Sequence, residues 1–179
     1  MLADIILCGS EFVKQGVAHS GGPVERCVVV PYGVDNRFSP VSHRRRSGPL
    51  RVLSVGEAGL RKGVTYAVEA AKLLGADAEF RWVGGVPLEP KAREEVSRHV
   101  ELTGAIPRSE MRAQFEWADV FFLPSVCEGS ATVSYEALMS GLPVVTTPNS
   151  GSLVTAGVHG FVVPVRDAPA MPAKLRHPH

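Results

Sequence analysis

Two adjacent cations in a glycine-rich turn are the first residues that could carry chemistry. Arg61 and Lys62 stand near the end of V-G-E-A-G-L-R-K-G, residues 55–63, directly before a segment of helical period. Free backbone N–H groups and the helix dipole favour negative charge at a helix start, so a basic pair there is well explained by a bound anion. The turn therefore indicates a diphosphate site. The alternative is a flexible turn whose basic pair is solvated.

Two carboxylates form a second pattern. Glu128 and Glu136 are separated by seven residues, and lie in a loop and on the helix expected to follow it. A carboxylate near a helix start can accept hydrogen bonds from sugar hydroxyls, and a second one can hold the two hydroxyls of a ribose. Taken singly, Glu128 is better explained as a helix cap and Glu136 as a solvated helix residue.

Several common catalytic motifs are absent from the sequence. It holds no G-x-x-x-x-G-K-[ST], H-E-x-x-H or G-x-S-x-G, and Gly56, Gly59 and Gly63 do not form G-x-G-x-x-G. These absences argue against a P-loop nucleotidase, a zinc protease, an α/β-hydrolase and a dinucleotide dehydrogenase. The six histidines are scattered, and no metal site is predicted.

Short apolar runs that alternate with helical segments must position these residues. Such alternation is typical of an α/β fold with a parallel sheet covered by helices on both faces. At the carboxyl edge of such a sheet, loops bind ligands. The expected strands span residues 4–8, 27–30, 51–55, 79–83, 99–102, 120–123, 142–146 and 161–163.

Three helices are the clearest. Apolar residues at spacings of three and four predict a helix over residues 64–74, which Gly75 ends. A second is expected over residues 109–117 with Ser109 as its N-cap, and a third over residues 132–140, closed by a glycine.

Composition limits the class of protein. The chain has 179 residues, 45% apolar and 21% charged, with a formal net charge of +1, which fits one compact domain and predicts no nucleic-acid partner. Its apolar runs are far shorter than the ~20 residues of a spanning helix, and no basic region of a secretory signal precedes the first one. We expect no transmembrane segment and a cytoplasmic location, with peripheral membrane attachment as an alternative. Cys8, Cys27 and Cys127 are expected to be reduced and mostly buried.

The chain divides into four parts by pattern. Residues 50–168 carry the alternating elements, and residues 39–49 form a linker with three arginines, 44–46, which we interpret as solvated. Residues 1–38 hold a separate strand and helix and a connecting strand, and residues 169–179 are expected to be an irregular tail. The strand at residues 4–8 is expected to expose apolar surface and an unpaired edge.

An ordered set of motifs resembles the retaining nucleotide-sugar glycosyltransferases of group 1, which have the GT-B fold. The match lies in the C-terminal, donor-binding half of that family and covers roughly residues 28–165. The motifs are V-V-V-P-Y-G-V-D at 28–35, R-K-G at 61–63, W-V-G-G at 82–85, L-T-G-A-I-P at 102–107, A-D-V-F-F-L-P-S at 118–125, the two glutamates at 128 and 136, and H-G-F-V-V-P at 159–164.

The resemblance implies a Rossmann-like C-terminal GT-B domain, with residues 1–38 as the remnant of an N-terminal acceptor domain. It also implies roles in the site. Arg61 and Lys62 would be catalytic by stabilising charge on the leaving diphosphate, and Glu128 by contacting hydroxyls of the donor sugar. The donor-binding residues would be Glu136 at the ribose, Ile106 near the nucleobase, and Gly56, Ala131, Thr132 and Val133 around the phosphates.

The implied reaction moves a sugar from a nucleoside diphosphate to an unknown acceptor with retention, using no metal or cofactor. The sequence departs from the family at Gly56-Glu57, where an arginine commonly follows the glycine, and between the two glutamates. Two alternatives stay open: a truncated module that binds the nucleotide sugar without turnover, with a separate acceptor-domain chain as its partner in a two-chain version, and a glycoside hydrolase that uses Glu128 and Glu136.

Overall fold

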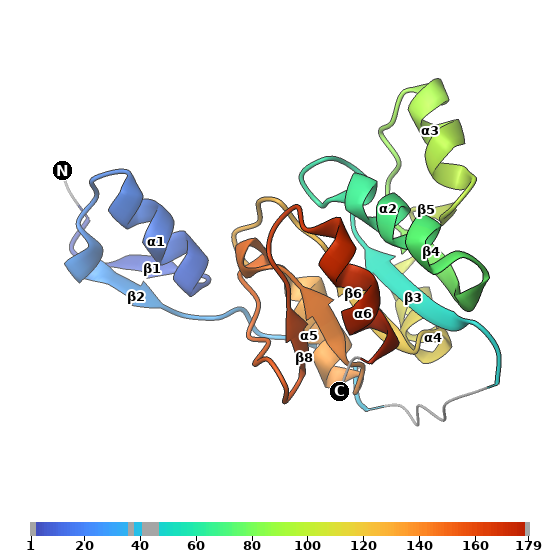
Figure 1. Ribbon diagram of the computed structural model, residues 1–179. Coiled ribbons are helices and arrows are strands. Elements are labelled where there is room, and N and C mark those ends of the chain that lie inside the picture. The colour runs from blue at the N-terminus through green and yellow to red at the C-terminus, as the bar shows by residue number, and fades with distance from the viewer. Residues whose placement is uncertain (1–2, 36–37, 41–46, 178–179) are drawn as a thin grey trace.

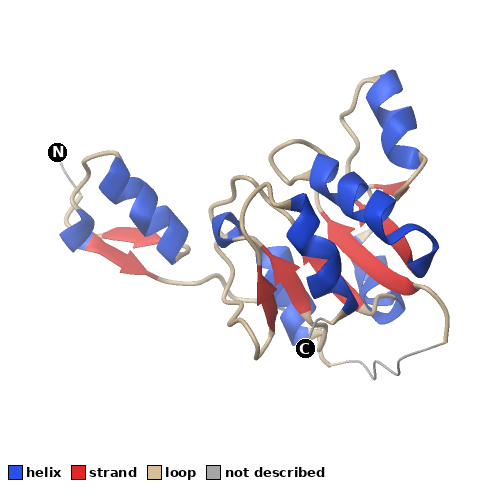
Figure 2. Cartoon of the chain, in the orientation of Figure 1, coloured by secondary structure: helices blue, strands red, loops and turns tan. Residues whose placement is uncertain are grey.

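The computed structural model describes residues 3–35, 38–40 and 47–177. Within them, a six-stranded parallel sheet is covered by helices on both faces, and a small two-stranded parallel sheet lies beside it with its own helix (Figures 1 and 2). The large sheet has the order β5-β4-β3-β6-β7-β8, so β3 and β6 are its central pair. The predicted α/β class with a parallel sheet is confirmed.

The strands of the large sheet are short and mostly buried, as the apolar runs predict. Four of the six corresponding predictions share at least three residues with the observed strand. The strand predicted at residues 161–163 begins one residue earlier, and the one predicted at residues 99–102 lies two residues further along the chain. The strands are β3 Leu50–Val55, β4 Ala78–Val83, β5 Glu101–Gly104, β6 Val120–Leu123, β7 Val144–Thr146 and β8 Gly160–Val162.

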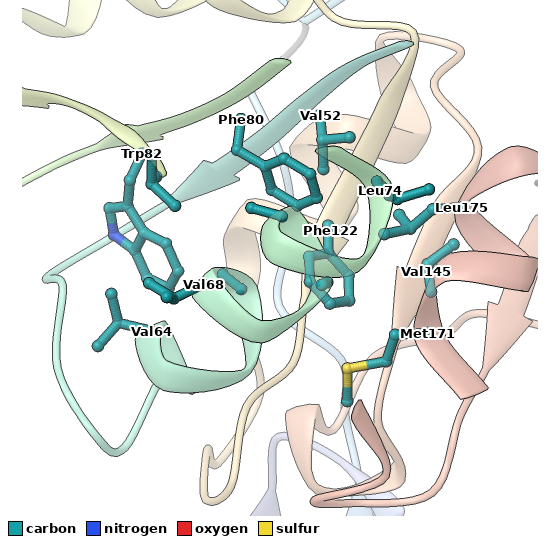
Figure 3. Packing of buried hydrophobic residues seen from close by; sticks show 14 of the residues in the cluster. Val52, Val64, Val68, Leu74, Phe80, Trp82, Phe122, Val145, Met171 and Leu175 are labelled. Carbon is teal, nitrogen blue, oxygen red and sulfur yellow. The ribbon is translucent and has the colours of Figure 1, made fainter. Parts of the chain in front are cut away.

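Two hydrophobic clusters lie on the two faces of the sheet. One holds residues of α2 (Val64–Leu74), α3 (Pro90–Ser97) and α6 (Met171–Arg176), and Figure 3 shows part of it around Phe80, Trp82 and Phe122. The other holds residues of α4 (Met111–Trp117) and α5 (Thr132–Met139). Both clusters must pack fully for the loops at the carboxyl edge to keep their positions.

Helix α2 has the predicted bounds because its residues at spacings of three and four, Ala67, Ala71 and Leu74 among them, are buried against the sheet. The helix before β6 differs from the prediction. A 3-10 turn, Arg108–Glu110, precedes α4, and Glu110 is the N-cap in place of Ser109, because the chain leaves Pro107 in a tighter turn.

The chain end from residue 169 is the clearest correction. The predicted irregular tail contains α6, whose Met171 and Leu175 are completely buried in the same cluster as α2. These two residues lie four apart and so share one face of the helix. The end of the chain is therefore part of the domain core.

The N-terminal unit comprises β1 (Ile6–Cys8), α1 (Glu11–His19), a 3-10 turn (Val24–Arg26) and β2 (Cys27–Val29). Strand β1 pairs with β2 in parallel, so the edge that was predicted to be unpaired has a partner on one side. Ser10 caps α1, accepting from Val13 N–H at 3.2 Å, and donates to the carbonyl of Gly129 in the large domain.

The segment between the two units ends inside the large domain. Phe38 is buried, and its ring meets that of Phe115 edge-on at 5.6 Å between centroids. The predicted boundary at residue 38 thus lies within the core of the large domain. The arginines at 44–46 of the predicted linker lie outside the described residues.

Candidate functional site

The two charged patterns meet where the central strands β3 and β6 end. The loop after β6 is bonded to the loop after β3, because the N–H groups of Val126 and Cys127 donate to the carbonyl of Arg61 at 2.9 and 3.3 Å. The Asn149 side chain donates to the carbonyl of Val126 at 2.8 Å and holds the same loop from the other side. The site is thus built on backbone hydrogen bonds between three loops.

Arg61, Lys62 and Glu128 form one cluster. The Lys62 ammonium lies 3.1 Å from Oε1 of Glu128, and Arg61 pairs with the same oxygen. The side chains of Lys62 and Glu128 are 10% and 11% exposed, whereas that of Arg61 is 57% exposed. Two cations share one carboxylate, so the cluster keeps an excess positive charge that favours an anion.

Gly56 makes room for this lysine. Its φ is +126°, and a Cβ built on it would lie 2.5 Å from Cε of Lys62. Its carbonyl accepts from the Trp82 indole at 2.8 Å, which fixes the turn to β4. The predicted glycine is therefore needed for the path of the lysine side chain, and its contact with a phosphate stays a prediction.

Gly63 holds the start of α2 against the neighbouring loop. Its φ is +79°, and a Cβ there would lie 2.0 Å from the carbonyl oxygen of Pro124. Only glycine allows this approach at this backbone angle. The close contact brings Lys62 next to the loop that carries Glu128.

The start of α5 corrects one expectation. Ala131 donates its N–H to the carbonyl of Ser150 at 3.0 Å, so this group is already used within the fold. Thr132 and Val133 are the first two residues of the helix, and no described side chain caps its N-terminus. The helix start therefore still offers the N–H groups of Thr132 and Val133.

Glu136 lies in the first turns of α5 and is 2% exposed. Its Oε1 pairs with Arg108, whereas its Oε2 is buried and has no hydrogen-bond partner among the described residues. A buried carboxylate oxygen normally accepts a hydrogen bond, so an unpartnered one indicates a ligand that supplies the donor. Ser125 Oγ, in the loop after β6, is buried and unpartnered in the same sense.

The sequence prediction missed Arg108 and Phe38. The Arg108 guanidinium contacts Glu136, 28 residues further along the chain, and lies 5.3 Å from the centroid of the Phe38 ring. The sequence did offer a signal for Arg108, since this basic residue directly follows A-I-P at 105–107, in the loop after a predicted strand. Ile106 is half-buried and packs against the core cluster on the α4 and α5 face of the sheet. Its contact with a nucleobase stays a prediction.

Two further features bear on the class of protein. No group of three or more potential metal-ligating side chains occurs among the described residues. Within that same part of the chain, no helix is long and apolar enough to cross a membrane.

Cys8 and Cys27 are buried as expected, while Cys127 beside the site is exposed.

Comparisons with known proteins converge on one group. The family of Glycosyl transferases group 1 matches residues 49–177. A putative colanic acid biosynthesis glycosyltransferase, WcaL, of Salmonella typhimurium is 34% identical over 96% of this chain and 47% of its own length. The chain thus spans about half the length of such relatives.

Solved structures show the same fold. The Anabaena protein HepE, crystallised in complex with UDP and glucose, superposes with a TM-score of 0.80 at 19% identity, over 98% of this chain and 53% of its own. The C-terminal domain of the group 1 protein LpcC from Francisella tularensis gives a TM-score of 0.69 at 20% identity, over 80% of this chain and 86% of its own.

Proposed function

Because this chain belongs to the group 1 glycosyl transferases, we propose that it forms the half of such an enzyme that binds a nucleoside-diphosphate sugar for transfer with retention. The expected C-terminal GT-B architecture is confirmed by the fold of its structural neighbours. Family membership separates the chain from the glycoside hydrolases, which were an alternative at the sequence level.

Glu136 carries the proposal. A carboxylate that is 2% exposed has one oxygen paired to a cation and the other unpartnered among the described residues, so the second oxygen is left for a donor that a bound ligand can supply. A ribose supplies such hydroxyl donors. Arg61 and Lys62 lie in the loop after β3, beside the loop that leads into the helix of Glu136, and their charges suit the diphosphate of the same ligand.

Within this function, Arg61 and Lys62 hold the diphosphate and stabilise the charge that develops as the glycosidic bond breaks. Arg61 is the more accessible of the two cations, because its side chain is 57% exposed, whereas that of Lys62 is 10% exposed. Glu128 orients both cations in the free protein and accepts from hydroxyls of the donor sugar. The N–H groups of Thr132 and Val133 contact the phosphates at the start of α5.

An acceptor half is the proposed partner. Ile5, Leu7, Val28 and Val30 are each about half exposed or more, and β-strand alternation with the pairing of Leu7 and Val28 places them on one face of the two-stranded sheet. The chain spans about half of its relatives' length. We propose that the acceptor half, in the same chain or a separate one, packs on this face.

The second candidate is a module that binds the donor without turnover. Transfer requires both substrates in one closed cleft, so a donor half alone is expected to bind and not to transfer. Adding a separately made acceptor half distinguishes the two: transfer upon addition supports the enzyme, and its absence supports the module.

A thermal-shift screen tests donor binding. The chain is melted with uridine, guanosine and adenosine diphosphates and with their common sugar conjugates, where a ligand at 100 times its Kd adds about 2.7 kcal/mol to the stability of the folded state. We expect a shift with one base. A cooperative transition that none of these ligands moves would contradict the proposal.

The variant Glu128→Ala sharpens this test. It is expected to weaken binding of the nucleotide sugar while hardly changing that of the free nucleotide, because Glu128 contacts the sugar, and both cations keep their charge and, on binding, pair with the diphosphate instead. Glu95→Ala is the matched control, since Glu95 pairs with Lys72 on the surface at 2.9 Å. Equal losses for both ligands would assign Glu128 to the diphosphate region only.

A further inference from the structure

We propose that Arg108 is a positioning residue of the donor site, which holds one oxygen of Glu136 so that the other one accepts from a ribose hydroxyl. Arg108 thereby sets a preference for ribonucleotides over nucleotides that lack these hydroxyls. This inference rests on the donor-binding function proposed above.

The contrast between the two partners of the ion pair is the first observation. The Glu136 side chain is 3% exposed and that of Arg108 is 57% exposed, so a surface cation reaches a buried carboxylate. Oε1 accepts from Nη2 of Arg108, and Oε2 has no partner among the described residues. By binding Oε1, the arginine thus leaves Oε2 as the oxygen that is available to a ligand.

A second contact fixes the arginine itself. Its guanidinium lies 5.3 Å from the centroid of the Phe38 ring, which is within the range of a cation–π interaction. Phe38 is 1% exposed and is held in turn by Phe115. The guanidinium is therefore anchored from two segments, the one that precedes β3 and helix α5.

The backbone that carries Arg108 is also well supported. It begins the 3-10 turn that follows Pro107, between β5 and α4. Helices α4 and α5 contribute to the same core cluster, so the turn and Glu136 are linked through packed elements. A planar, permanently charged guanidinium on such a support fixes the carboxylate in one orientation.

Loss of the guanidinium would leave the carboxylate buried without a cation. A buried charge without a partner is unfavourable, and the freed side chain can rotate. The affinity loss should then concern only ligands that use Glu136. A general structural role would instead weaken all nucleotides alike, and a role as a competitor for Glu136 would make the variant bind more tightly.

The experiment measures Kd by calorimetry for a ribonucleoside diphosphate and its 2′,3′-dideoxy analogue, with the base chosen by the screen above. For Arg108→Ala we expect the ribonucleotide to bind about tenfold more weakly or worse, and the dideoxy analogue to change less than about twofold. Arg108→Lys should recover part of the loss. Arg112→Ala is the matched control, because Arg112 is similarly exposed and pairs with Glu116 at 2.8 Å.

Each result has a definite meaning. Equal losses for both nucleotides, no loss, or tighter binding by Arg108→Ala would overturn the positioning role while leaving donor binding intact. Failure of the unchanged, folded chain to bind any nucleoside diphosphate would overturn the proposed function as well. Melting curves without ligand check folding, and if Arg108→Ala does not fold, the same comparison is made with Arg108→Gln, which keeps a donor and loses the charge.

Discussion

The substitution Lys62→Met removes one charge from the cluster and changes little else. Methionine keeps the unbranched stem that passes over Gly56, where a Cβ would lie 2.5 Å from Cε of the lysine. Glu128 keeps its pair with Arg61. The change therefore isolates the contribution of the ammonium to binding.

The expected magnitude follows from the contacts of the ammonium. Lys62 has three N–H donors. Its contact with Glu128, at 3.1 Å, uses one of them and leaves two for a diphosphate. A hydrogen bond to a charged group contributes about 1.5–3 kcal/mol, so loss of one such bond raises Kd roughly 10- to 150-fold, and loss of both raises it further. The free energy of unfolding should change by less than about 1 kcal/mol, because desolvation offsets much of the gain from a buried pair.

Calorimetric titration with the nucleoside diphosphate measures this change, and a thermal melt without ligand measures stability. Lys72→Met is the control, in the helix that follows the turn of Lys62, since Lys72 is 47% exposed and pairs with Glu95. The control should bind as the unchanged chain does. A Lys62→Met chain that folds normally and binds within twofold of the unchanged chain would refute the assignment of the diphosphate to this cluster.

Three further predictions concern the fold. Gly63→Ala should lower the free energy of unfolding by about 2 kcal/mol or more in a denaturant titration, because of its φ of +79° and the carbonyl of Pro124 at 2.0 Å from the new Cβ; unchanged stability would contradict this backbone path. Leu175→Ala should lower the free energy of unfolding by about 2–5 kcal/mol in the same titration, since Leu175 is fully buried. A decrease below ~1 kcal/mol would contradict the packing of α6 in the core. A thiol reagent should modify Cys127 in the native chain well before Cys27, because burial and a hydrogen bond to Cys8 raise the pKa of the Cys27 thiol; equal rates, read by mass spectrometry, would contradict that burial.

The sheet could be predicted from the sequence because parallel strands buried on both faces are continuous apolar runs. The strand at Val120–Leu123 has the predicted bounds for this reason. Helix α6 could not be predicted in the same way. Its sequence, M-P-A-K-L-R, is short and contains a proline, and only the cluster that it completes reveals Met171 and Leu175 as core residues.

The site shows a similar division. The positions of Lys62, Glu128 and Glu136 at the carboxyl edge follow from motif spacing and the parallel topology. Their pairing does not, because Arg108 reaches Glu136 only through the packing of α4 and α5 on one face of the sheet. Likewise, hydrogen bonding by Ala131 to Ser150 depends on how the loop after β7 returns to the site.

Titration of the chain with a nucleoside-diphosphate sugar, followed by calorimetry, tests the central claim of donor binding most directly. The unchanged chain should bind one ligand per chain, and Glu136→Ala should weaken this binding by about tenfold or more, since it removes the buried acceptor oxygen. A folded chain that shows no saturable binding, or a Glu136→Ala variant with unchanged affinity, would contradict the account.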